Sequence, residues 1–82
     1  MITGPQLKAA RALAGLSQRE LAEASGLSLP TIQRMEASRG TVRGVVDSLT
    51  RVIAALDAAG VVLIGEGEVS HGGGRGVRRK QP

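Results

Sequence analysis

Apolar residues recur every three or four positions along two stretches of the first 60 residues, a spacing typical of the buried face of an α-helix. The first stretch spans about residues 4–14, where the apolar positions are Leu7, Ala10, Leu13 and Ala14. Thr3 and Gln6 form a capping box at its start, and Gly15 is placed to end it. The second stretch spans about residues 45–59, where the apolar positions are Val45, Leu49, Val52, Ile53 and Leu56. We therefore expect a helix over each stretch.

Two shorter helices are predicted between these stretches by the residues that begin and end helices. Ser17 followed by Glu20 is a second capping box, and it opens a helix over about residues 18–24. Gly26 is suited to the left-handed conformation that ends this helix. Ser28 caps the next helix, over about residues 28–36, with Pro30 in its first turn, where a missing N–H does no harm. The two helices are expected to meet at an angle across the Gly26 turn.

The composition changes at Gly60, after which the chain is rich in glycine. Residues 61–64 are apolar, mostly β-branched and too few for a helix, so they are predicted to form a strand. Residues 77–80 are compatible with a second short strand or with a basic tail. A hairpin alone is marginally stable in water. We therefore expect strand 61–64 to pair with the same strand of a second copy, with dimer contacts from Val61, Val62, Leu63, Ile64 and Val77.

Composition and charge narrow the class of protein. The 82 residues include no aromatic residue and no cysteine, so a small aliphatic core is expected, and it would gain from burying surface in a homodimer. One histidine without cysteine cannot form a zinc site, and no nucleophile or acid–base set has catalytic spacing, so we expect no metal, cofactor or enzymatic activity. The net charge of +4 favours a polyanionic partner. No apolar run approaches the roughly 20 residues of a membrane span, and no signal pattern opens the chain, so a cytoplasmic protein is expected.

Over about residues 3–57 the sequence resembles the XRE-type, lambda-repressor-like (Cro/repressor) helix-turn-helix family. The residues that carry the resemblance are Ser17-Gln-Arg-Glu-Leu-Ala, Ser25-Gly-Leu-Ser and Thr31-Ile-Gln-Arg-Met-Glu. It implies a mostly α, compact bundle of four to five helices, followed here by a short C-terminal strand or hairpin. The helix over about residues 28–36 would lie in the major groove of double-stranded DNA. Residues 1–60 would be the DNA-binding domain, and residues 61–82 would dimerise or be flexible.

The resemblance implies particular functional residues. Gln18, at the start of the second helix, would face a DNA phosphate. The recognition helix would present Ser28, Leu29, Pro30, Thr31, Gln33 and Arg34, and the next loop would approach the DNA backbone with Arg39 and Arg43. Leu29 and Pro30 carry no hydrogen-bonding side chain, so base recognition by hydrogen bonds would rest on Gln33 and Arg34. Arg11 and Glu36 match a structural ion pair between the first helix and the end of the recognition helix.

These features predict a sequence-specific DNA-binding transcription regulator, such as a repressor, that acts as a homodimer. The alternative is an antitoxin-like protein-interaction module, in which residues 61–82 bind and neutralise a partner protein. The basic segment 75–80 is compatible with three roles: a clamp on DNA, a strand in a dimer sheet, and a disordered end. The glycine-rich residues 65–76 are expected to be a flexible linker and not a catalytic loop.

Overall fold

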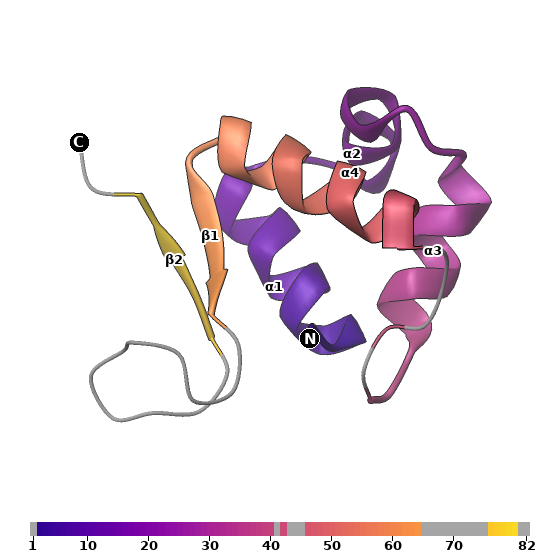
Figure 1. Cartoon of the computed structure of the whole chain (residues 1–82), viewed down its shortest axis with the longest axis horizontal. Coiled ribbons are helices and arrows are strands. Elements are labelled where there is room, and N and C mark those ends of the chain that lie inside the picture. Colours follow the sequence, from indigo (N-terminus) through magenta and orange to yellow (C-terminus); the bar gives the residue numbers. More distant parts are fainter. Residues whose placement is uncertain (1, 41, 43–45, 65–75, 81–82) are drawn as a thin grey trace.

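Four helices and one antiparallel hairpin make up the part of the protein that the computed structural model describes, which is residues 2–40, 42, 46–64 and 76–80. The elements, in chain order, are α1 (Gly4–Ala14), α2 (Gln18–Ser25), α3 (Leu29–Ala37), α4 (Val46–Ala58), β1 (Val61–Ile64) and β2 (Gly76–Arg79) (Figure 1). The predicted mostly helical fold with a short C-terminal hairpin is confirmed. Among the described helices, none is long and apolar enough to cross a membrane.

The helix boundaries follow the capping residues. At α1, the Gln6 N–H donates to Thr3 Oγ1 at 3.1 Å and the Thr3 N–H donates to Gln6 Oε1 at 3.2 Å, which completes the predicted capping box. The box at α2 closes in the same way between Ser17 and Glu20, at 2.9 and 3.0 Å. Helix α2 runs one residue past its predicted end, and the hydroxyl of that residue, Ser25, donates to Leu21 O at 2.7 Å. Local capping thus sets where each of the first helices starts.

The core is aliphatic and draws on every helix. Leu7, Leu21, Ile32 and Leu56, from α1, α2, α3 and α4 in turn, are each 0% exposed. Val61 of β1 joins them at 1% exposed. Because burying apolar area contributes about 25 cal/mol per Å², these side chains stabilise the packing of the helices and the hairpin on one another.

The segment that follows α3 is fixed to the start of the chain. The Val42 N–H donates to Ile2 O at 2.8 Å, and the Gly4 N–H donates to Gly40 O at 3.2 Å. A Cβ atom at Gly4 would lie 2.0 Å from Ser38 O, so only glycine permits this approach of α1 to the end of α3. These contacts hold Ser38, Gly40 and Val42 against the start of α1.

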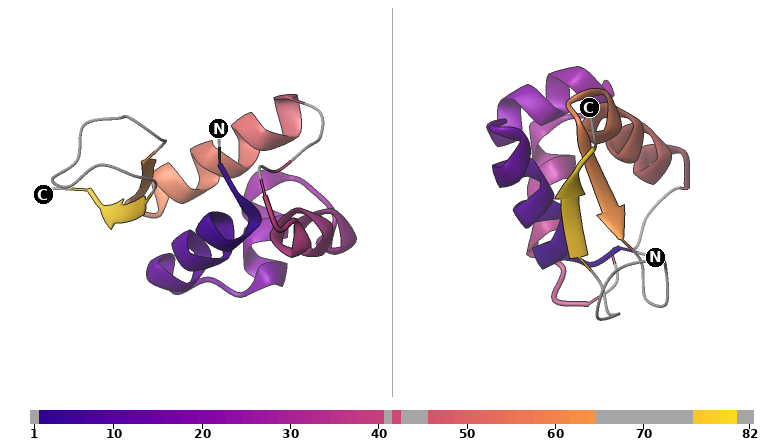
Figure 2. Two further views of the ribbon diagram at one scale, coloured as in Figure 1. Left: turned by 90° about the horizontal axis from the view of Figure 1, so that it is seen from below. Right: turned by 90° about the vertical axis from the view of Figure 1, so that its left-hand side faces the viewer.

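The hairpin lies across one end of the helical layer, against α1 and α4 (Figure 2). Its register pairs Val61 with Arg79 and Leu63 with Val77. One edge of β1 thus pairs with β2 of the same chain, and pairing of its other edge with a second copy stays a prediction. Packing against two helices supplies the support that a lone hairpin lacks.

Gln6 connects the hairpin to α1. Its Nε2 donates to Ile64 O at 2.8 Å and to Gly76 O at 2.9 Å, one carbonyl from each strand. Since its Oε1 accepts from the Thr3 N–H, the buried Gln6 amide is satisfied at both ends. One side chain therefore serves the helix cap and the hairpin together.

Candidate nucleic-acid interface

Helices α2 and α3 meet at a tight turn. Gly26 has φ 72° and ends α2, and the Leu27 N–H donates to Ala22 O at 3.0 Å. Ile32 and Met35 of α3 face inward and are buried. The side of α3 away from these residues is left to solvent, and α3 lies at the opposite end of the molecule from the hairpin (Figure 1).

A chain of contacts runs along the outer side of α3. Ser28 Oγ accepts from the Thr31 N–H at 3.2 Å and lies 2.8 Å from Thr31 Oγ1. Arg34 Nη2 donates to Thr31 Oγ1 at 3.5 Å. Residues three apart share one face of a helix, so Ser28, Thr31 and Arg34 form a row, and the Arg34 guanidinium keeps most of its five N–H donors for a ligand.

The remaining predicted residues on α3 differ in what they offer. Leu29 is half-buried, whereas Pro30, Gln33 and Arg34 are exposed. Neither Leu29 nor Pro30 has a side-chain donor or acceptor, and the Thr31 hydroxyl is occupied by Ser28. Gln33 and Arg34 are thus the side chains of this face that can donate hydrogen bonds to a base edge.

A buried ionic cluster joins α1, α2 and α3. Arg11 Nε donates to Glu36 Oε2 at 2.6 Å and Arg11 Nη2 donates to Glu36 Oε1 at 3.2 Å, while Arg11 Nη1 donates to Leu16 O at 2.9 Å. The Glu36 side chain is 4% exposed and that of Arg11 is 17% exposed. Gln18 Nε2 also donates to Glu36 Oε1, at 3.1 Å. The cluster fixes the end of α3 against the last turn of α1 and the start of α2.

This cluster changes what Gln18 can do. Its expected role is a phosphate contact, and one of its two amide N–H donors is already used by Glu36. At the same helix start, hydrogen bonds from the backbone and then the hydroxyl of Ser17 lower the pKa of Glu20 below its ordinary value of 4.5. Glu20 is therefore an anion at neutral pH, beside the N-terminus of α2 and three residues from the Ser17 cap.

The arginines of the loop after α3 are placed unevenly. Arg39 is exposed, on the segment held against Ile2 and Gly4. Arg43 lies outside the described residues. Arg51 has its Nη1 3.7 Å from where a Cβ of Gly26 would be, so α4 brings a guanidinium group to the α2–α3 turn.

The residues expected to mediate dimerisation are mostly used within the chain. Val61 is buried in the core, and Leu63 and Val77 pack against it. Val62 and Ile64 are half-buried on the other face of the hairpin. Their role between protomers stays a prediction. Within the described residues no three His, Cys, Asp or Glu side chains gather to hold a metal ion.

Comparison with known proteins agrees with this architecture. No curated protein matches the chain significantly. Residues 4–62 match the family described as a helix-turn-helix domain, a range that begins with α1 and reaches into β1. Members of such families bind DNA by placing the second helix of the motif in the major groove. With more than half of its length matched, and with α2, the Gly26 turn and α3 in place, this chain belongs to the helix-turn-helix domain family of DNA-binding proteins.

Proposed function

We propose that this protein is a sequence-specific transcription regulator that inserts α3 into the major groove of double-stranded DNA. The observation that carries the proposal is the outer face of α3, where Gln33 and Arg34 are exposed opposite the buried Ile32 and Met35. The contact with Thr31 orients Arg34 along this face. A major groove is wide enough to admit one such helix.

The chemistry of this face suggests how bases are read. Arg34 can donate two hydrogen bonds to O6 and N7 of a guanine, and Gln33 can pair with N6 and N7 of an adenine. Leu29 and Pro30 would touch thymine methyl groups or sugars. The second amide N–H of Gln18 and the guanidinium of Arg39 would bind phosphates, and Arg43 would do so from the same loop.

Substitution of Arg34 tests the recognition face. A binding site selected from a random duplex library provides the probe, and Arg34→Ala should weaken its binding by about 1–3 kcal/mol, or roughly 5- to 150-fold in Kd. The urea midpoint should not move, because Arg34 is exposed. The matched control is Lys8→Ala, which removes an exposed cation on α1 and should weaken DNA binding much less. Wild-type binding by Arg34→Ala would refute the assigned face.

Salt provides a second test of DNA binding. Each phosphate neutralised by a cationic side chain releases counterions, so log Kd should rise linearly with log salt concentration. The selected duplex should also bind more tightly than a scrambled duplex of the same length at moderate salt. If the two duplexes bind equally at every salt concentration, the protein is not sequence-specific.

The regulator is proposed to act as a homodimer through the open edge of β1. The Lys80 N–H donates to Gly60 O at 2.7 Å, so the N–H and C=O groups of Val61 and Leu63 point away from β2. Two such edges can pair antiparallel with Val62 opposite its counterpart, and no like charges meet. A dimer would place two α3 helices about 34 Å apart for a two-fold symmetric operator.

Charge placed at the centre of this contact tests it without DNA. Val62→Arg should shift the mass in sedimentation towards the monomer, because the two guanidinium groups would face each other. An equimolar mixture of Val62→Arg and Val62→Glu should restore the dimer. Ile53→Arg, on the exposed side of α4, is the control and should stay dimeric. Dissociation by Ile53→Arg alone would move the contact to α4, and a monomeric wild type would refute dimerisation.

A further inference from the structure

The outer edge of β2 is open in the part of the chain that the structure describes. In the hairpin register, the N–H and C=O groups of Val77 and Arg79 point away from β1. The Arg78 side chain donates to Arg79 O at 3.2 Å from an exposed position, and no described backbone group pairs with this edge. An open edge of this kind can accept a further strand.

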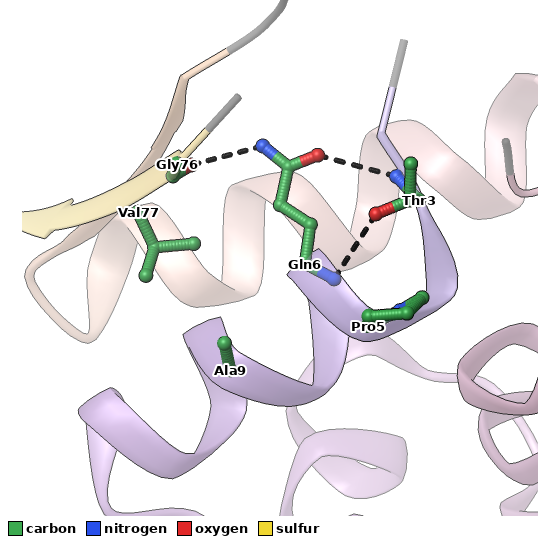
Figure 3. Close-up of a pocket in the computed structure, with 6 residues that line it drawn as sticks. All are labelled: Thr3, Pro5, Gln6, Ala9, Gly76 and Val77. Carbon is green, nitrogen blue, oxygen red and sulfur yellow. Dashed lines mark hydrogen bonds between the residues drawn. The ribbon is translucent and has the colours of Figure 1, made fainter. Parts of the chain in front are cut away.

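An apolar hollow lies beside this edge, between β2 and the first half of α1. It has a volume of about 330 Å³, and its lining residues are Thr3, Pro5, Gln6, Ala9, Gly76 and Val77. Figure 3 shows Val77 pointing towards α1, with Pro5 and Ala9 along the helix below it. The Gln6 amide is fully occupied by Thr3, Ile64 and Gly76, so the hollow offers an apolar surface. Its size is at the lower end for ligand pockets, so it has room for an aliphatic side chain.

The other end of the same contact between α1 and the hairpin is basic. A hollow of about 230 Å³ there is lined partly by Arg79 and Lys80. Arg79 is exposed, and Lys80 Nζ is 3.4 Å from Asp57 Oδ2, a separation that leaves the pair weak and solvated. A strand advances about 3.3 Å per residue, so the apolar hollow near Gly76 and the basic one near Arg79 are roughly 10 Å apart.

We propose that the outer edge of β2 binds an extended, acidic segment of a partner protein, which adds to the hairpin as a third strand. An aliphatic side chain of that segment fills the hollow beside Val77, and an Asp or Glu about two to four residues away lies against Arg79. A second copy of this chain is a poor occupant, because two antiparallel β2 edges would place Arg78 directly opposite Arg78. In the alternative function, residues 61–82 bind a partner protein, and this site is where that partner would lie.

The site is independent of the proposed DNA interface. It lies at the opposite end of the molecule from α3 (Figure 1), so a partner segment would leave the recognition face uncovered. A protein bound there would be brought to the DNA by this chain, or it would alter the DNA affinity of this chain through steric overlap with a neighbouring protein. DNA binding and peptide binding can therefore be measured separately, and failure of one does not imply failure of the other.

Selection from a displayed library of random peptides tests the site, with the full chain as bait. The enriched peptides should share an aliphatic residue followed or preceded by Asp or Glu at the stated spacing. Arg79→Glu and Ala9→Glu should each weaken binding of the best synthetic peptide by about tenfold or more, because they place a carboxylate at the two ends of the groove. Ala54→Glu, the same change at an exposed site on α4, should leave peptide affinity unchanged.

Two further measurements separate strand addition from a folding defect. Arg79→Glu should regain affinity for a version of the peptide in which the acidic residue is replaced by Lys, which a misfolded variant cannot do. Hydrogen exchange at the Val77 and Arg79 amides should slow when the peptide is bound. The proposal is overturned if no acidic peptides are enriched, or if the selected peptides bind Ala9→Glu and Arg79→Glu as they bind the wild type.

Discussion

Replacing Arg11 with Met removes the cation from a buried carboxylate and keeps most of the side-chain volume. Glu36 would lose the bonds at 2.6 and 3.2 Å and retain the neutral Gln18 donor at 3.1 Å. Because its side chain is 4% exposed, water cannot replace the lost donors. Breaking a buried pair in this way costs about 3–5 kcal/mol, against a total stability of roughly 4–12 kcal/mol for a chain of this length.

Urea unfolding followed by far-UV circular dichroism measures this cost. The matched control is Asp47→Asn, which breaks the Asp47–Arg51 pair at 3.0 Å, whose side chains are 68% and 52% exposed. Asp47→Asn should lower the free energy of unfolding by less than about 1 kcal/mol, because solvent screens the pair. The double variant Arg11→Met with Glu36→Met should recover most of the stability, since an apolar pair can replace a buried ion pair at little cost.

Two results would refute this reasoning. If Arg11→Met lowers the free energy of unfolding as little as Asp47→Asn does, the cluster is solvated and does not hold α1 against α3. If the double variant is as unstable as Arg11→Met, the loss comes from packing and not from an uncompensated charge at Glu36.

Three other changes probe the fold. Gly4→Ala should lower the free energy of unfolding by about 1–3 kcal/mol in urea, because the new Cβ would lie 2.0 Å from Ser38 O. An unchanged urea midpoint would show that the segment after α3 moves away from the new methyl group at little cost. Ile32→Ala should cost about 2–5 kcal/mol in the same assay, since Ile32 is 0% exposed. The pKa of Glu20 is lowered in the folded state by Ser17, so its contribution to stability is present above pH 4.5 and is lost as pH falls through the folded pKa. Glu20→Gln should therefore flatten the loss of stability below pH 4.5, as urea midpoints at a series of pH values would show.

The local elements of the fold could be predicted because their causes lie within a few residues. The boxes Thr3–Gln6 and Ser17–Glu20 close over three residues, and the Gly26 turn needs only its own backbone. The outer face of α3 also follows from spacing alone, because burying Ile32 and Met35 leaves Gln33 and Arg34 outside. Capping and helical periodicity depend on neighbours along the chain, so they can be read without the tertiary structure.

The tertiary structure decided which distant groups meet. Sequence spacing predicts a strand at residues 61–64 and suggests a second copy as its partner, whereas the structure pairs one of its edges with residues 76–79 of the same chain. Gln6, predicted only as part of a helix cap, also binds carbonyls 58 and 70 residues away. Gln18 was expected to face phosphate and gives one donor to Glu36. Such contacts depend on how the aliphatic core closes, because packing of α1 against the hairpin and α3 brings together polar groups that have no local relation in the sequence.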